Sequence, residues 1–255
     1  MNVAEYERMY RLEDTYWWFV ARHRLIQAIL RQHYGIPRAS CDQRLLLDVG
    51  CGTGAMSCYL SQWGKVVSAD FSHLALQFSA QRGLKHLVGA DAMRLPFRAA
   101  TFDAIIALDL LEHLPDDRAA LCEFHRVLKP DGMVCALVPA YPHLWSEHDI
   151  ALMHHRRYVR RELGERFISA GFQIQKLSHT MTLLYPVVAL QRRLLARKTP
   201  RIPPQAAMPC FPEPVNAALT WIVTAENALA RRLNFPFGVS ILCVACKSEP
   251  LATDT

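Results

Sequence analysis

The stretch Leu45–Gly54 reads LLLDVGCGTG and places a carboxylate beside three closely spaced glycines. Gly50, Gly52 and Gly54 follow an apolar run and precede a helical pattern, so backbone amides at this turn can approach a ligand without Cβ atoms in the way. A dinucleotide-binding turn has the spacing G-x-G-x-x-G, whereas this turn has G-x-G-x-G with Asp48 two residues before it. We expect the carboxylate of Asp48 to suit an ammonium group better than a pyrophosphate.

Two further carboxylates follow at intervals that match the ends of the next two apolar runs. Asp70 stands 20 residues after Gly50, where a carboxylate at a strand end would accept hydrogen bonds from both ribose hydroxyls. Asp91 ends the third run. Three carboxylates in register predict a nucleoside ligand that carries a positive charge.

The pattern D-x-G-x-G-x-G, with an aspartate at each of the next two strand ends, resembles the class I S-adenosylmethionine-dependent methyltransferases over residues 44 to about 180. The resemblance implies S-adenosylmethionine as the cofactor. It places Asp48 and the glycine loop at the methionine portion, Asp70 at the ribose, and Phe71 and Asp91 at the adenine. The implied cofactor-binding residues are Asp48, Gly50, Cys51, Gly52, Asp70, Phe71, Asp91, Ala92, Leu108 and Asp109.

The apolar run 102–108 ends in a polar cluster, where ligands bind in open α/β sheets. Relatives that methylate nucleic-acid bases usually carry an Asn/Asp-Pro-Pro-aromatic run here, and its absence means that we expect no nucleic-acid partner. Methyl transfer to a hydroxyl needs a base, for which His113 and His155 are the two candidates. The alternative roles are a structural tie at the strand end for His113, and substrate positioning or loop packing for His155.

Asp-Leu-Leu-Glu-His at 109–113 is similar to the Glu-x-x-Glu-His of ubiquinone-biosynthesis O-methyltransferases. The similarity implies a hard cation such as Mg²⁺ on Asp109, Glu112 and His113. The first acid here is the shorter aspartate, and many relatives with Leu-Glu-His bind no metal. We therefore expect no resident metal.

The stretch from Trp145 to Phe172 looks like the region that lines the acceptor pocket in the type 11 methyltransferase group. In it, Arg156 and Arg157 could bind an acceptor carboxylate or phosphate, or could be solvated charges at a helix start. Near the N-terminus, Tyr16-Trp-Trp-Phe19 suits a helix that folds over the cofactor site, or one that packs on the sheet. The predicted substrate-binding residues are Trp18, Trp145, Arg156 and Tyr158.

Apolar runs bounded by Gly, Pro and Asp alternate with helical patterns from residue 44 onward, which predicts repeated βα units. The runs are 45–49, 66–69, 86–88, 102–108, 133–138, 172–177 and 239–245, and the helical patterns between them are 56–62, 74–82, 117–128 and 160–170. The runs lack period-two alternation, so both faces of the strands should be buried. The predicted fold is a doubly wound, mostly parallel, seven-stranded Rossmann-like sheet with an N-terminal helical cap and a helical insertion before the last strand.

The insertion contains two amphipathic segments, 182–197 and 215–232, separated by 200–214 with six prolines. Apolar faces beside basic residues are typical of helices on an anionic membrane surface, and a soluble lid or dimer contact is the alternative. The predicted units are a cap at 1–43, a cofactor-binding core at 44–180, the insertion at 181–236, the final strand at 237–248 and a tail at 249–255.

The net charge of +6 is uneven, with −2 over residues 1–150 and +8 over 151–255, which favours an anionic partner. The longest stretch without a charged residue, Val49–Gly64, has 16 residues, and Leu177–Gln191 has 15; both fall short of the roughly 20 that a membrane span needs. No signal-peptide pattern is seen, and the eight scattered cysteines read as reduced thiols. We expect a cytoplasmic protein with a possible peripheral contact on the membrane.

These patterns predict transfer of a methyl group to a hydroxyl of a small or lipid-like acceptor. Transfer to carbon or nitrogen is an open alternative. A nicotinamide-dependent oxidoreductase is disfavoured by the glycine spacing and by Asp48. A degenerate cofactor-binding module is disfavoured by the intact Asp48, Asp70 and Asp91. The oligomeric state is not encoded in any of these motifs.

Overall fold

The computed structural model describes residues 3–35, 44–195 and 208–247. Seven strands form one sheet in the order β3-β2-β1-β4-β5-β7-β6. They are β1 Leu45–Val49, β2 Lys65–Asp70, β3 Leu87–Gly89, β4 Phe102–Leu108, β5 Leu128–Pro139, β6 Phe172–Thr180 and β7 Ser240–Lys247. Only β7 runs antiparallel to its neighbours. The predicted mostly parallel, Rossmann-like sheet is confirmed.

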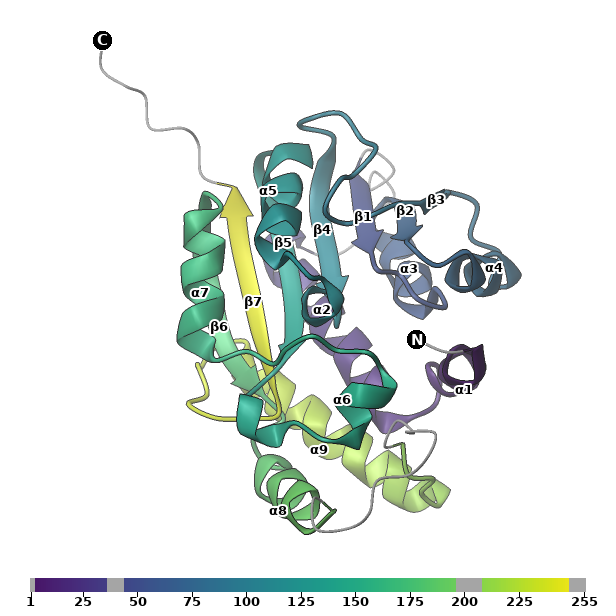
Figure 1. The fold of residues 1–255 in the computed structure, drawn as a ribbon, viewed down its shortest axis with the longest axis vertical. Helices are drawn as coiled ribbons and strands as arrows, with labels where there is room; N and C mark the ends of the chain where they lie inside the picture. The colour runs from purple at the N-terminus through teal and green to yellow at the C-terminus, as the bar shows by residue number, and fades with distance from the viewer. Residues whose placement is uncertain (1–2, 36–43, 196–207, 248–255) are drawn as a thin grey trace.

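Helices cover both faces of this sheet, because successive strand residues point to opposite sides (Figure 1). Ile105 and Ala107 of β4 pack with α5 (Asp117–Val127) and α7 (Arg160–Ser169) in one core. Ala104 and Ile106 pack with α2 (Trp17–Tyr34) and α3 (Ala55–Leu60) in another. The central strand β4 is therefore buried on both faces, as the absence of alternation indicates, whereas the edge strands β3 and β6 carry exposed residues.

The sheet reverses its direction of winding between β1 and β4, which lie side by side although two strands separate them in the chain. The carboxyl ends of β1, β2 and β4 meet at one edge, the lower edge in Figure 1. Such a switch point leaves a crevice in which α/β proteins bind ligands. It brings the glycine turn and the polar residues after β4 together.

The N-terminal cap and the insertion pack on each other beside this edge. The cap consists of α1 (Val3–Leu12) and α2, and the insertion contributes α8 (Tyr185–Leu195) and α9 (Glu213–Ala230). Tyr16, Trp17, Val223 and Val239 share a third hydrophobic core with apolar residues of α8. The side chain of Asn216 accepts a hydrogen bond from the backbone N–H of Trp17 at 2.9 Å, which caps the first turn of α2.

The segment after Pro139 is not irregular throughout. It contains a short helix, α6 (Glu147–Ala151), which begins with a capping box between Ser146 and Asp149. Two further predictions, the irregular 200–214 segment and the tail at 249–255, lie largely or wholly outside the described residues. Of the helices that the structure describes, none combines the length and apolar character needed to cross a bilayer.

Candidate functional site

A cavity of about 1440 Å³ lies at the carboxyl ends of β1, β2 and β4. Its walls also include the cap, the segment from Ser146 to Arg157, and the side of α8 that carries Val188 and Gln191. All ten residues predicted to bind the cofactor line it. The cavity therefore joins the glycine turn to the cap and the insertion in one space.

The glycine turn needs its glycines for both conformation and space. Gly50, Gly52 and Gly54 have φ values of 71°, 55° and 88°, in the left-handed region that residues with a Cβ rarely adopt. A Cβ on Gly50 would lie 2.8 Å from a side-chain carbon of Leu110, and one on Gly52 would lie 2.9 Å from Met9. Any larger residue would fill space at the cavity wall.

Asp70 ends β2 and accepts one hydrogen bond on each carboxylate oxygen. The backbone N–H of Gly52 donates to Oδ2 at 2.9 Å, and that of Ser72 donates to Oδ1 at 2.8 Å. A carboxylate has about four lone-pair sites, so each oxygen retains a position for a hydroxyl donor. The next residue, Phe71, is 83% exposed and lines the same cavity, which leaves its ring free to stack on an aromatic ligand.

Asp48 is buried at the end of β1 and accepts a hydrogen bond from Ser57 at 2.5 Å. Burial, together with the nearby charge of Asp70, raises the pKa of Asp48 to about 7. A cation placed beside it would restore the ionised form. Asp91 lies farther along the edge, where its carboxylate accepts a hydrogen bond from the N–H of Met93 at 2.8 Å.

The cap contacts the cavity edge directly. Arg22 of α2 forms an ion pair with Asp109, which follows β4 with a φ of 48°. Glu13 accepts a hydrogen bond from Thr53 in the glycine turn, and Arg82 lies 3.3 Å from the same carboxylate. Burial raises the pKa of Glu13 to about 7. The residues between α1 and α2 are thus held on the turn that would carry the cofactor.

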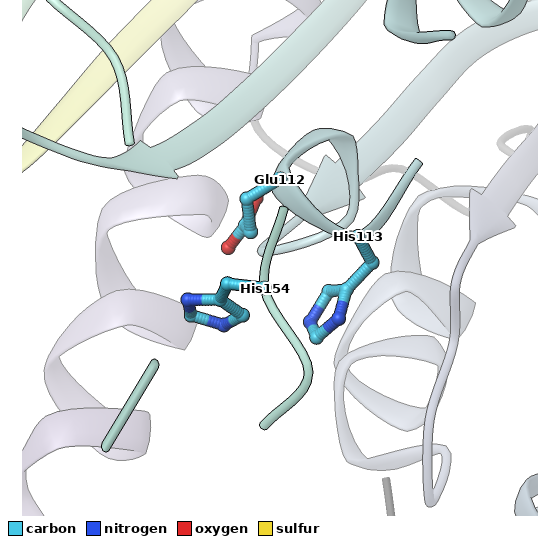
Figure 2. Close-up of side chains that lie close together, drawn as sticks. All are labelled: Glu112, His113 and His154. Atoms are coloured by element: carbon cyan, nitrogen blue, oxygen red, sulfur yellow. The ribbon is translucent and has the colours of Figure 1, made fainter. Parts of the chain in front are cut away.

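The side chains of Glu112, His113 and His154 lie close together in the cavity wall, and Figure 2 shows how they face one another. Glu112 and His113 belong to the short helix η3 (Leu111–His113), and His154 follows α6. Burial, with the charge of Asp109 nearby, raises the pKa of Glu112 well above its ordinary value. Burial and the neighbouring His154 lower the pKa of His113 to about 3.

Asp149 orients His154 and fixes the surrounding segment. Its carboxylate lies 2.9 Å from Nδ1 of His154 and accepts a hydrogen bond from Arg157 at 2.7 Å. Arg192 of α8 lies 3.2 Å from the same carboxylate. Burial acts to raise the pKa of Asp149, but these partners outweigh it and hold the pKa below its ordinary value.

The predicted bases occupy different positions. His155 is exposed on the cavity wall, and its backbone N–H donates to the carbonyl of Glu112 at 2.7 Å. His113 also lines the cavity but is largely enclosed. Sequence reasoning missed His154, because only the fold distinguishes it from the adjacent His155. The serine–aspartate capping box at 146–149, which turns Asp149 inward, is the signal that could have found it.

Of the predicted substrate-binding residues, Trp18 lines the cavity, whereas Trp145, Arg156 and Tyr158 do not. Tyr158 is fully buried, and its hydroxyl donates to Asp117 at 2.5 Å. Arg156 donates to the carbonyls of Leu114 and Pro115. Tyr158 and Arg156 thus hold the segment that forms the wall, and acceptor binding by Trp145, Arg156 and Tyr158 stays a prediction. Arg157 lines the cavity but is committed to Asp149.

A seven-stranded doubly wound sheet with a glycine turn after β1 and an acid after β2 resembles the arrangement in class I S-adenosylmethionine-dependent methyltransferases. The family described as "Methyltransferase domain" matches residues 47–136. This range contains the glycine turn, Asp70, Asp91 and the residues after β4. The resemblance to the type 11 group is confirmed.

A demethylmenaquinone methyltransferase of Staphylococcus epidermidis is 41% identical over 106 residues, which cover 38% of this chain and 44% of that relative. A demethylmenaquinone methyltransferase of Staphylococcus aureus is 40% identical over the same shares. The chain thus spans less than half the length of the curated relatives that it matches.

Solved structures agree on the fold over nearly the whole chain. One is a chain from the complex between the Haloferax volcanii Trm112 methyltransferase activator and a methyltransferase, with a TM-score of 0.61, 19% identity, and coverage of 97% of this chain and 96% of that one. Another is the Burkholderia thailandensis 1,6-didemethyltoxoflavin-N1-methyltransferase with bound S-adenosylhomocysteine, with a TM-score of 0.53, 18% identity, and coverage of 90% and 79%. Residues 47–136 therefore match a methyltransferase domain, and the solved structures share the fold over nearly the whole chain.

Proposed function

We propose that the chain transfers a methyl group from S-adenosylmethionine to a hydroxyl of a small, lipid-like acceptor related to quinones. The observation that carries the proposal is the continuous cavity. One end has the glycine turn, Asp70 and Phe71, and the other is walled by Trp18 and apolar residues of α8. Its volume of about 1440 Å³ exceeds the 300–1,000 Å³ range of ordinary ligand sites, so there is room for two molecules.

The residues present fit the cofactor. Space that a Cβ would fill lies over Gly50 and Gly52, the buried Asp48 suits an ammonium group, and Asp70 keeps lone pairs for a diol. When bound, S-adenosylmethionine supplies a methyl group on a positively charged sulfur. The protein's part is then to align the acceptor, exclude water and remove a proton.

His155 is the better candidate for the base. It is exposed on the cavity wall, whereas burial lowers the pKa of His113 to about 3 and makes it a poor proton acceptor near neutral pH. The base would take the hydroxyl proton and leave an oxygen nucleophile facing the cavity. His113 would then serve to position the acceptor side of the site.

The acceptor class is supported by the printed name of the relatives, which is demethylmenaquinone methyltransferase, and by the apolar wall. The fold by itself does not fix the reaction, because the [4+2]-cyclase SpnF shares it with a TM-score of 0.54 and 20% identity over 89% of this chain. The reaction must therefore be tested directly.

The test is to incubate the purified chain with methyl-labelled S-adenosylmethionine and extracts of lipids and polar metabolites, and to fractionate the label. We expect label in the lipid extract, attached through an ether oxygen that resists mild base. Label attached to carbon or nitrogen would contradict O-methylation, and absence of label from both extracts would contradict the activity. His155→Gln should reduce turnover by about 10²–10⁴-fold with unchanged binding of S-adenosylhomocysteine.

We also propose that α8 contacts an anionic membrane surface beside the cavity mouth. Leu183, Val187, Leu190 and Leu194 are 51–63% exposed and recur at helical spacing, next to the exposed Arg193. The basic residues that the sequence places beside these apolar faces are Arg192, Arg193, Arg197, Lys198, Arg231 and Arg232. Of these, Arg192 instead faces Asp149, and Arg197 and Lys198 lie outside the described residues. Because α8 also lines the cavity, an acceptor dissolved in the membrane would enter from this side.

Co-sedimentation with phosphatidylglycerol vesicles at low salt tests the contact. We expect the chain to bind these vesicles and not phosphatidylcholine vesicles, and Leu190→Glu with Leu194→Glu to abolish binding. Ile168→Glu on α7 is the matched control, because Ile168 is equally exposed (62%) and lies elsewhere on the surface. No binding to the anionic vesicles would contradict the proposal, as would a dimer that the double variant dissociates.

A further inference from the structure

Glu112 is a buried carboxylate without a partner among the described residues. Its exposed fraction is 0%, and neither of its carboxylate oxygens has a hydrogen bond to another residue that the structure describes. The methyl-transfer account gives this side chain no role. A buried polar group left unsatisfied costs several kcal/mol if charged, so native proteins almost always provide a partner. A cation that reaches the two oxygens from the cavity would be such a partner and would favour the ionised carboxylate over the protonated one.

Two histidines face this carboxylate, and an outer hydrogen bond orients each of them. His154 contacts Asp149 through Nδ1, and its Nε2 is buried without a partner in the described structure. His113 has a hydrogen bond to the backbone of Met153. Metal-binding histidines characteristically donate one ring N–H to a carboxylate or a carbonyl and present the other nitrogen to the ion. Both rings follow that arrangement.

The three side chains offer ligand atoms that all lie within 4.8 Å of one another (Figure 2). Zinc–ligand distances of about 2.0–2.2 Å allow two ligands of one ion to be at most about 4.4 Å apart, so small side-chain rotations close the site. We propose that Glu112, His113 and His154 bind one divalent transition-metal ion of the Zn²⁺, Fe²⁺ or Co²⁺ type. Two imidazoles and one carboxylate select these ions over Mg²⁺, which prefers an all-oxygen shell.

This ligand set differs from Asp109, Glu112 and His113, the set implied by sequence similarity. Asp109 is held in its ion pair with Arg22, and the position is filled by His154 from a segment 41 residues beyond His113. All three proposed ligands line the cavity. If the proposed methyl transfer is correct, the open coordination positions of the ion would face the acceptor oxygen.

Metal binding can be measured without any methyl-transfer assay. The full-length chain, freed of metal by a chelator, is titrated with Zn²⁺ by calorimetry and with Co²⁺ by visible absorption. We expect one ion per chain, d–d bands of a low-coordinate Co²⁺ site, a higher melting temperature with Zn²⁺, and no competition by millimolar Mg²⁺. Glu112→Gln and His154→Gln should each weaken binding by at least about 10–100-fold.

His155→Gln is the matched control, because it removes the adjacent imidazole, which lies outside the cluster. It should bind Zn²⁺ like the parent chain while losing methyl transfer, which separates the two proposals. Asp109→Asn should retain the site. The inference is overturned if the parent chain binds no stoichiometric ion, if His155→Gln weakens binding as much as His154→Gln, or if Asp109→Asn abolishes binding. Melting curves without metal identify any variant that fails to fold.

Discussion

The two ends of the cavity are built from contacts of very different range. At the cofactor end, the N–H of Gly52 donates to Asp70, only 18 positions away. At the proposed acceptor end, the side chain of Asn216 accepts a hydrogen bond from the backbone N–H of Trp17, which is 199 positions away in the sequence. The side chain of Asn227 donates a hydrogen bond to the carbonyl of Ala21, which is 206 positions away. A short-range motif specifies the first end by itself, whereas the second forms only when cap and insertion meet. Changes at the first should therefore affect the cofactor, and changes at the second the acceptor.

The largest effect is expected at the cofactor end from Asp70→Ala. The substitution removes the acceptor for two backbone N–H groups and for the ribose hydroxyls that Asp70 is proposed to bind. Hydrogen bonds to charged groups are worth about 1.5–3 kcal/mol each, so affinity for S-adenosylhomocysteine should fall by about 100-fold or more. Calorimetry measures this affinity, and an unchanged value would contradict the proposed contact between Asp70 and the cofactor.

A smaller effect on cofactor binding is expected from substitutions in the glycine turn. There, the cost of a positive φ can be measured separately from the cost of a steric clash. Gly50 and Gly83 both have positive φ, at 71° and 84°, but only at Gly50 would a Cβ meet a neighbour, Leu110 at 2.8 Å. Gly50→Ala should lower the free energy of unfolding by about 1–3 kcal/mol and weaken cofactor binding. Gly83→Ala should give only the conformational cost of about 1 kcal/mol with normal binding. Equal binding by both variants would mean that the close approach at Gly50 is irrelevant to the site.

The acceptor end can be loosened by Asn216→Ala, which removes the cap of α2. The loss of a helix cap costs about 0.5–2 kcal/mol of stability. The KM for the acceptor should rise while the affinity for S-adenosylhomocysteine stays close to that of the parent chain. Thr220→Ala is the control, because the Thr220 hydroxyl donates only within α9, to the carbonyl of Asn216. A larger loss of cofactor affinity than of acceptor affinity would contradict the division between the two ends.

The smallest effect is a pH dependence of cofactor affinity through Asp48. Burial raises the pKa of Asp48 to about 7, so the carboxyl is protonated at pH 6 and ionised at pH 8. An ammonium group beside it favours the ionised form, so affinity for S-adenosylhomocysteine should rise with pH by up to about tenfold per unit below 7 and level off above it. Asp48→Asn should flatten the profile. An affinity that does not change with pH in the parent chain would contradict the proposal that Asp48 contacts the ammonium group.

The same contrast explains what the sequence could predict. Strands β1 and β4 begin and end where the apolar runs do, because Gly, Pro and Asp punctuate them locally. All ten cofactor residues lie on the cavity because they follow strand ends, whose common edge is set by the parallel sheet. Periodicity and spacing are short-range signals, and this half of the molecule is governed by short-range rules.

The residues on the proposed acceptor side were harder to predict from the sequence, for a physical reason. Tyr158 and Arg156 lie in a segment that resembles an acceptor-pocket wall, and in the fold they hold that wall through Asp117, Leu114 and Pro115. The neighbours His154 and His155 are indistinguishable in the sequence, and only the turn after α6 places one in the cluster and the other on the wall. Contacts between α2 and α9 leave no local trace in either segment.

The most direct test of the central account is calorimetry of the parent chain with S-adenosylhomocysteine and, separately, with NAD. The account predicts one S-adenosylhomocysteine bound per chain, with a raised melting temperature, and no measurable binding of NAD. A folded chain that binds NAD, or that gives no heat and no thermal shift with S-adenosylhomocysteine, would contradict it.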